Sequence, residues 1–473
     1  MIVANKIVIS GAGVTGLVSA LLLLKKHKGE DIYLVDKNDE AGGLLRKFDY
    51  GPWGSFDYGM HNMLQTGITE LDELLWGLLP PEEWQLLNGN KRDLAGIFFN
   101  GRLQRNSPYI DLRNLSPRDY ETCVTALWTH FAGAIRSETK TPSNFEEFAH
   151  FRFGEIVSNK TIIPSIEKIF KRKASELDYM ASRLTPLERL TFCDEDLIKE
   201  LTKSDFLKER IAWSDQRTLP LDRSSGRNAF YPVKYGIYRI VDSIIDRLQK
   251  AGVNLLLGSE IKGIEYTKGR ITAIQTEHAG KASKLDSIER LIWTSNIGLL
   301  GRFLGLDFTG MRYDKPLNTV VVNLVLDRLP DQMEDLYYFF CYDSDYHTYR
   351  ITNFANYCKG AYRNGGYPIS IELLMDDDSF AGCDLEKLAI EEFTRLQIGS
   401  PETKVLFAKA EVLQNGFPMP TSNNISSLRG IRSGTLDLDL QNLSILGILA
   451  KDDLFFQTDV LTHLFDTLNE LYG

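Results

Sequence analysis

Three glycines and one aspartate near the N-terminus have the types and the spacing that bind a dinucleotide. Gly11, Gly13 and Gly16 directly follow the apolar run of residues 6–10, and Asp36 lies 20 residues after Gly16. The first glycine allows a tight turn, the second lets a pyrophosphate approach the backbone, and the third lets a helix pack closely on a strand. Asp36 would accept hydrogen bonds from a ribose diol. The alternative is an α/β turn whose glycines serve packing alone.

A second glycine pair, Gly42-Gly43, bears on which dinucleotide the chain binds. The stretch from Asp36 to Arg46 resembles the second signature of flavin-dependent amine oxidases and their relatives, in which a glycine pair lets the chain pass close to the cofactor. NAD and FAD share the opening motif, so this resemblance favours FAD as the cofactor. The competing interpretation is an ordinary Gly-Gly turn.

A single histidine follows this region. The segment Tyr58-Gly59-Met60-His61 resembles the tyrosine-glycine-X-histidine segment of UDP-galactopyranose mutases, whose histidine loop lies near the flavin ring. A lone histidine in a sequence is more often structural than catalytic, but imidazole is also the side chain that titrates near neutral pH. The position of His61 after the glycine pair favours the catalytic interpretation.

An arginine in the C-terminal half carries the second candidate for chemistry. Residues 349–357 are similar to the YR-x-x-x-F-x-NY stretch of eukaryotic-type mutases, and residues 230–236 and 417–421 match further mutase segments in the correct order. Arg350 offers a planar fork of donors for a phosphate or a flavin carbonyl. Its alternative role is that of a surface arginine in a tyrosine-rich loop. The tyrosines of residues 337–346 are equally readable as a core edge or as a sugar or uracil platform.

The sequence departs from the mutases near its C-terminus. The relatives carry a Gly-Arg pair there, whereas this chain keeps Gly447 and has Ile448 in place of the arginine. Losing one charge-assisted contact to an anion costs a few kcal/mol of affinity. The departure therefore bears on tight flavin binding, on UDP as the carrier, or on both.

The resemblance implies a flavin-dependent sugar-nucleotide mutase that interconverts pyranose and furanose rings through a flavin N5–sugar adduct. The catalytic residues implied are His61 and Arg350. The residues implied to bind FAD are Gly11, Gly13, Gly16, Asp36, Gly42, Gly43, Gly447 and Asp459. Those implied to bind substrate are Arg183, Tyr349 and Tyr357. No metal site is expected. The implied partners are a nucleotide sugar and an external reductant for the flavin.

Two other functions remain open on the sequence. A flavin-dependent amine oxidase or desaturase shares the glycine motifs and would take a hydride from its substrate. A catalytically altered relative that kept the fold as a binding protein is the third possibility, and Ile448 motivates it. The colour of the purified protein and its consumption of oxygen separate the three.

The elements that must position these residues form an α/β fold. Residues 6–10 and 31–36 are predicted strands on either side of a helix at 17–26, which is the start of a doubly wound sheet. We expect a Rossmann-type FAD-binding domain from residues 1–88, 226–300 and 430–473. A helical substrate domain is expected at 113–225, and a mixed or antiparallel sheet substrate domain at 89–112 and 301–429.

Composition and charge exclude several classes of protein. The 473 residues include 43% hydrophobic and 25% charged residues, which is ordinary globular composition. The formal net charge of −10 argues against general nucleic-acid binding, since that needs a basic face. The five scattered cysteines form no CxxC motif, which is typical of a reducing compartment. We therefore expect a cytoplasmic protein without a membrane span.

Overall fold

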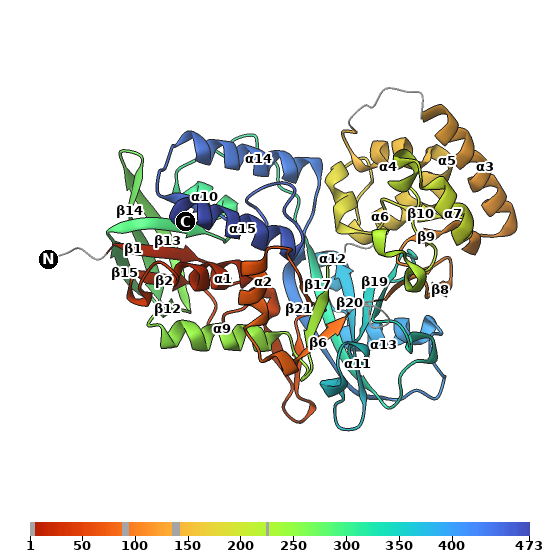
Figure 1. Cartoon of the computed structure of the whole chain (residues 1–473), viewed down its shortest axis with the longest axis horizontal. Coiled ribbons are helices and arrows are strands. Elements are labelled where there is room, and N and C mark those ends of the chain that lie inside the picture. Colours follow the sequence, from red (N-terminus) through yellow and green to blue (C-terminus); the bar gives the residue numbers. More distant parts are fainter. Residues whose placement is uncertain (1–4, 88–93, 135–141, 224–226) are drawn as a thin grey trace.

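The computed structural model describes residues 5–87, 94–134, 142–223 and 227–473. In Figure 1 the parallel sheet and its helices lie at the left, and at the right a helical region lies above a larger mixed sheet. No helix within the described ranges combines the length and the apolar character that crossing a membrane requires.

The N-terminal strand lies in the centre of a five-stranded parallel sheet with the order β12-β2-β1-β16-β22. Its strands are β1 (Lys6–Ser10), β2 (Ile32–Val35), β12 (Asn254–Leu256), β16 (Ile288–Trp293) and β22 (Leu443–Ile445). Strands buried on both faces of a parallel sheet read as continuous apolar runs, as β1 and β2 do. The predicted parallel sheet is confirmed, and its strands come from three separated parts of the sequence.

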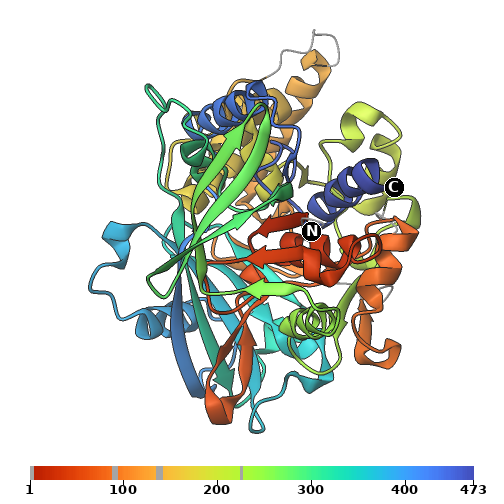
Figure 2. The ribbon, with the colours of Figure 1, turned by 90° about the vertical axis from the view of Figure 1, so that its left-hand side faces the viewer.

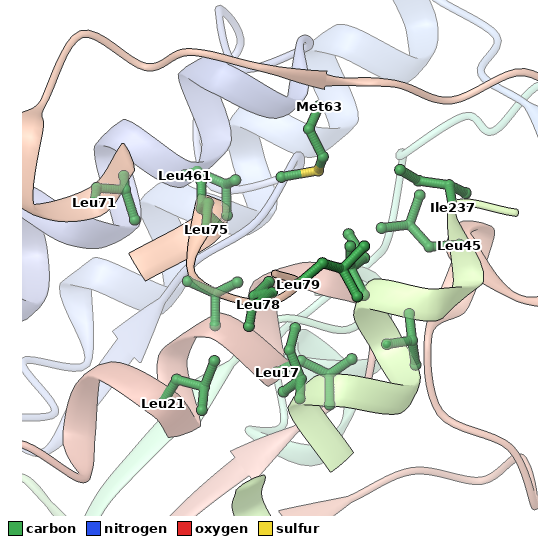
Figure 3. Close-up of a cluster of buried hydrophobic side chains, with 14 of the residues drawn as sticks. Leu17, Leu21, Leu45, Met63, Leu71, Leu75, Leu78, Leu79, Ile237 and Leu461 are labelled. Carbon is green, nitrogen blue, oxygen red and sulfur yellow. The ribbon is translucent and has the colours of Figure 1, made fainter. Parts of the chain in front are cut away.

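Helices cover one face of this sheet. They are α1 (Val14–Leu23), α9 (Tyr238–Lys250) and α15 (Gln457–Tyr472). Leu17 and Leu21 of α1 lie in one buried cluster with Leu461 of α15 and with residues near α9, such as Ile237 (Figure 3). The predicted helix at 17–26 thus begins and ends three residues earlier, because α1 starts directly at the glycine turn.

The other face packs against an antiparallel three-stranded sheet and two helices. They are β13 (Ser259–Thr267), β14 (Arg270–His278), β15 (Lys281–Asp286), α10 (Ile297–Phe303) and α14 (Ser422–Asp437). Val8, Leu291 and Trp293 of the parallel sheet are buried in the core of this layer. Figure 2 shows the long strands of the small sheet from the side, above the central strands.

The larger sheet has the strand order β21-β17-β20-β19-β18-β7-β8. Its strands are β7 (Ala95–Phe99), β8 (Arg102–Gln104), β17 (Leu317–Leu326), β18 (Tyr338–Cys341), β19 (Thr348–Asn353), β20 (Tyr367–Met375) and β21 (Val405–Phe417). Only β18 and β7 run parallel among these neighbours, so the predicted mixed sheet is confirmed. Helix α13 (Leu385–Arg395) packs on one face through a separate apolar core.

The helical region occupies residues between the two halves of the Rossmann-type part. Its helices are α3 (Pro117–Ala134), α4 (Phe145–Phe153), α5 (Glu155–Val157), α6 (Ile163–Phe170), α7 (Glu195–Leu201) and α8 (Asp205–Lys208). Their buried side chains share one core with Phe340 and Tyr349 of the mixed sheet. The helices therefore cover the face of that sheet opposite α13.

Short elements complete the described fold. They are α2 (Thr69–Trp76), α11 (Phe354–Tyr357), α12 (Asp377–Phe380), β3 (Lys47–Asp49), β4 (Ser55–Asp57), β5 (Met63–Leu64), β6 (Trp84–Leu87), β9 (Ile110–Asp111), β10 (Leu190–Thr191) and β11 (Ala229–Pro232). The β3–β4 hairpin leads directly to the His61 segment. Of the predicted domain boundaries, 88/89 and 225/226 lie outside the described residues, and the division into domains stays a prediction.

Candidate functional site

The glycine loop joins β1 to α1 as the sequence predicts. Gly11 has a φ of +103°, a conformation that L side chains rarely adopt. A Cβ on Gly16 would lie 1.9 Å from the carbonyl oxygen of Gly11, so this glycine is required for packing. A Cβ on Gly13, in contrast, would meet no atom within 4 Å. Open space beside the backbone at the N-terminus of a helix is what a diphosphate needs.

Asp36 lies directly after β2, beside this loop. One of its carboxylate oxygens accepts a hydrogen bond from the backbone N–H of Ala12 at 2.7 Å, and the other accepts one from the N–H of Asn38 at 2.8 Å. These bonds fix the carboxylate at the edge of the sheet. The side-chain Nδ2 of Asn38 also donates to the second oxygen at 2.8 Å, so of about four lone-pair positions roughly one stays open for a hydroxyl of a ribose diol.

The second glycine pair packs against the first motif. The backbone N–H of Gly42 donates to the carbonyl of Ala12 at 2.8 Å, and Gly42 and Gly43 have φ values of +115° and +58°. A Cβ on Gly43 would lie 3.1 Å from the Cα of Gly13. The two glycine segments therefore form one backbone surface without side chains.

The C-terminal segment reaches the same loop. Gly447, with a φ of +93°, lies so close to α1 that its Cβ would be 3.8 Å from the hydroxyl of Thr15. The turn directly follows the end of β22 at Ile445 and residue Leu446. Asp459 lies in the first turn of α15. Ile448, the residue after Gly447, is 45% exposed.

These residues fit a dinucleotide that contains ADP. The structure brings together Gly11, Gly13, Gly16, Asp36, Gly42, Gly43 and Gly447 around the start of α1. The open side of Gly13 and the exposed apolar side chains of Leu44 and Ile448 are surfaces that such a ligand would cover.

The predicted arginine is held by a carboxylate. Arg350 on β19 lies opposite Glu372 on β20. Its Nε donates to Glu372 Oε1 at 3.1 Å, and its Nη2 donates to Oε1 and Oε2 at 2.7 and 2.9 Å. The two side chains are 18% and 6% exposed. Burial acts to lower the pKa of Arg350, but the charge of Glu372 outweighs burial and raises it above its usual range.

The predicted histidine lies at the same place. A Cβ on Gly59 would lie 3.3 Å from Oε1 of Glu372, so the Tyr58–His61 segment crosses the Arg350–Glu372 pair. Burial, together with the positive charge of Arg350, lowers the pKa of His61 to about 4. His61 is therefore neutral at pH 7, where it can exchange a hydrogen bond without adding a second positive charge.

A buried aspartate anchors this segment. Asp57 is fully buried and accepts hydrogen bonds from the hydroxyl of Tyr231 at 2.6 Å and the backbone N–H of Ile237 at 3.0 Å. Burial raises its pKa to about 7, although these bonds act in the opposite direction. The sequence analysis missed both Asp57 and Glu372. A lone acid within the apolar run of β20 was a usable signal for Glu372.

The three predicted substrate residues have different surroundings. Tyr349 is 5% exposed and packs against Phe417, with ring centroids 5.1 Å apart. Tyr357 is fully buried in an aromatic core with Tyr231, with ring centroids 5.4 Å apart. Arg183 is exposed, and its Nη1 donates to the carbonyl of Asp453 at 3.5 Å. Their contact with a substrate stays a prediction.

No group of three or more potential metal ligands occurs among the residues that the structure describes. The candidate site described above consists of glycine backbone, the carboxyl groups of Asp36, Asp57 and Glu372, the paired Arg350 and the neutral His61.

Comparisons with known proteins show which folds this chain is similar to. Residues 9–75 match the family described as NAD(P)-binding Rossmann-like domain. A crystal structure of reduced UDP-galactopyranose mutase superimposes with a TM-score of 0.77 at 19% identity, covering 99% of this chain and 94% of that chain. The chain has the fold of UDP-galactopyranose mutase. The predicted Rossmann-type fold and the predicted likeness to the mutases are thereby confirmed.

One further solved structure and one curated sequence are also similar to this chain. A putative protoporphyrinogen oxidase from Exiguobacterium sp. 255-15 has a TM-score of 0.65 at 13% identity, with 99% of both chains covered. The curated 1-hydroxycarotenoid 3,4-desaturase from Flavobacterium sp. (strain P99-3) is 25% identical over 276 residues, which is 58% of this chain. The match spans about half (54%) of that relative's length.

Proposed function

We propose that the protein is a flavin-dependent enzyme that binds FAD and acts on a small molecule between its parallel and mixed sheets. The glycine loop, Asp36 and the Gly42-Gly43 turn would hold the ADP half. The Tyr58–His61 segment and Arg350 would meet the flavin end, because the hairpin β3–β4 leads from one set to the other. FAD, when bound, supplies the covalent or redox chemistry, and the protein supplies orientation and charge.

Within this class we propose a sugar-nucleotide mutase, which interconverts pyranose and furanose rings. The observation that carries it is the juxtaposition of His61 and Arg350 in a fold that superimposes on a mutase over 99% of the chain. The Nε and Nη2 atoms of Arg350 donate hydrogen bonds to Glu372, whereas Nη1 donates none of these three bonds. One N–H edge is therefore available to a departing diphosphate, whose negative charge it would partly compensate.

His61 has a different role in this proposal. Its neutral imidazole can donate one hydrogen bond and accept another, so it can orient a flavin carbonyl or a sugar hydroxyl. Because its pKa is about 4, it does not repel Arg350 at neutral pH. His61 thus positions the reacting groups, while a proton on its ring would weaken the site.

The first experiment is the absorbance spectrum of the purified protein before and after reconstitution with FAD. The proposal predicts a flavin spectrum. The protein is then reduced with dithionite and incubated with UDP-galactose and related nucleotide sugars, and the products are separated by chromatography. We expect a furanose product from at least one of them, and a large loss of that product in Arg350→Gln. A flavin-loaded protein that isomerises none of them would overturn the mutase assignment.

A second candidate is an FAD-dependent oxidoreductase of the desaturase or oxidase kind. The match to a 1-hydroxycarotenoid 3,4-desaturase supports it, and so do the exposed apolar residues Leu44 and Ile448 beside the glycine loop. It predicts reduction of the bound flavin by substrate and reoxidation by oxygen or another acceptor. An oxygen-electrode screen with amines and unsaturated lipids distinguishes it from the mutase, which shows no net oxidation. A colourless protein that takes up no FAD supports the binding-protein alternative instead.

A further inference from the structure

An arginine of the second glycine segment lies between the two ends of the candidate site. Arg46 follows η2 (Gly43–Leu45), whose Gly43 packs on the open face of Gly13. Leu45 is 3% exposed and lies in the apolar core near Leu17 (Figure 3). Leu44, in contrast, is 53% exposed. The segment is thus anchored through Leu45 to the apolar core.

The side chain of Arg46 is fixed at two points. Its Nε donates to the carbonyl oxygen of Gly43 at 3.0 Å, and its Cζ lies 4.7 Å from the ring centroid of Tyr58. Tyr58 is in turn stacked on Phe48, with centroids 4.0 Å apart. A guanidinium held by a backbone carbonyl and a ring face loses little further freedom when it binds a ligand.

The outer edge of this guanidinium has no protein partner. Within the residues that the structure describes, Nη1 and Nη2 of Arg46 donate no hydrogen bond and make no ion pair, although the side chain is only half-exposed. Arg350 differs, because its guanidinium donates three hydrogen bonds to Glu372. Ile448, which follows the Gly447 turn beside the glycine loop, carries no charge.

The contacts also give Arg46 a definite place along an extended ligand. Gly43 packs against Gly13, and its carbonyl oxygen accepts the hydrogen bond from Nε of Arg46. The guanidinium of Arg46 lies over the ring of Tyr58. The next residue, Gly59, lies against Glu372. A dinucleotide that runs from the glycine loop to Arg350 would pass this edge with its diphosphate. A planar pair of N–H donors matches the oxygens of a diphosphate.

We propose that Arg46 is the cationic ligand of the dinucleotide's diphosphate in this protein. The inference rests on the proposed binding of FAD and adds the residue that neutralises the negative charge of its diphosphate. The test measures equilibrium affinity for FAD and for ADP, which carries the diphosphate without the flavin. Arg46→Gln should weaken both about tenfold to a hundredfold, the range expected for a charge-assisted contact.

Two matched variants control for folding and for charge in general. Arg46→Lys keeps the positive charge and should recover most of both affinities. Lys47→Gln removes the neighbouring charge, whose ammonium lies 4.9 Å from the ring centroid of Tyr238, and should leave both affinities unchanged. Because charge attraction is screened by salt, the ratio between the native protein and Arg46→Gln should shrink at high ionic strength.

The outcomes separate this inference from the proposed function. If Arg46→Gln weakens FAD but not ADP, the arginine meets the flavin end and the diphosphate assignment is overturned. Unchanged affinities for both ligands overturn it as well. If the native protein binds neither FAD nor ADP, the proposed function fails and the role of Arg46 fails with it.

Discussion

Removing one partner of the Arg350–Glu372 pair should open the centre of the mixed sheet. The change Glu372→Gln keeps the shape of the side chain and removes its charge. Three N–H···O contacts of 2.7 to 3.1 Å are weakened, and the guanidinium, 18% exposed, is left without its counter-charge. Breaking a buried pair in this way costs about 3 kcal/mol or more. At about 1.36 kcal/mol per factor of ten, local opening should become more than about a hundredfold more frequent.

Hydrogen exchange followed by mass spectrometry measures this opening locally, so it does not require the whole chain to unfold in one step. Amides of β19 and β20 should exchange more than about a hundredfold faster in Glu372→Gln, while those of β1 and β2 stay as they are. The control is Asp246→Asn, which breaks the exposed pair with Lys250 on α9. A rate within about threefold of the native protein in β19 and β20 would refute the buried-pair reasoning.

Four other changes test the site. Gly13→Ala should fold normally and lose FAD affinity, because its Cβ meets no protein atom, whereas Gly16→Ala should lower the thermal midpoint, since its Cβ would lie 1.9 Å from a carbonyl oxygen. The pKa of His61 is about 4 in the folded protein and about 6.5 in the unfolded chain, so the free energy of unfolding should fall as the pH drops from 6.5 to 4. Denaturant midpoints measure this fall, which should be smaller in His61→Phe. The pKa of Asp57 is about 7 in the folded protein and 3.8 in the unfolded chain, so Asp57 reduces the stability of the fold as the pH rises from 3.8 to 7. In Asp57→Asn, the thermal midpoint should depend less on pH over this range. Ile448→Arg adds a cation beside the glycine loop and should tighten FAD binding severalfold, as read from flavin fluorescence.

Local rules were enough to predict that the residues proposed to bind the cofactor lie together. Gly11, Gly13 and Gly16 act through contacts within the first strand, turn and helix, and Asp36 follows the next strand. These positions are close in sequence, so the pattern of the chain carries the geometry. The structure places them together as predicted.

The arrangement of the proposed catalytic residues depends on contacts that no local pattern contains. Arg350 meets Glu372 only because β19 and β20 pair in one register, and a shift by one residue would send both side chains to other partners. The Tyr58–His61 segment reaches them from a distant part of the sequence. A resemblance to known segments predicted His61 and Arg350, but it gave no reason to select Glu372 or Asp57. Tyr357, which the same resemblance selected, is fully buried in an aromatic core, and its contact with a substrate stays a prediction.

Arg46 and Arg350 therefore differ in what they can bind. A diphosphate at Arg350 would have to share the guanidinium with Glu372 or displace it, and a displaced carboxylate that is only 6% exposed would lose its counter-charge. Arg46 has its outer donors unpaired, so binding an anion there breaks no existing ion pair. If the substrate is a nucleotide sugar, its diphosphate should meet only the free Nη1 edge of Arg350. Recognition of the nucleotide must then come mainly from other residues, and Arg350→Gln should reduce turnover more than it reduces affinity for UDP.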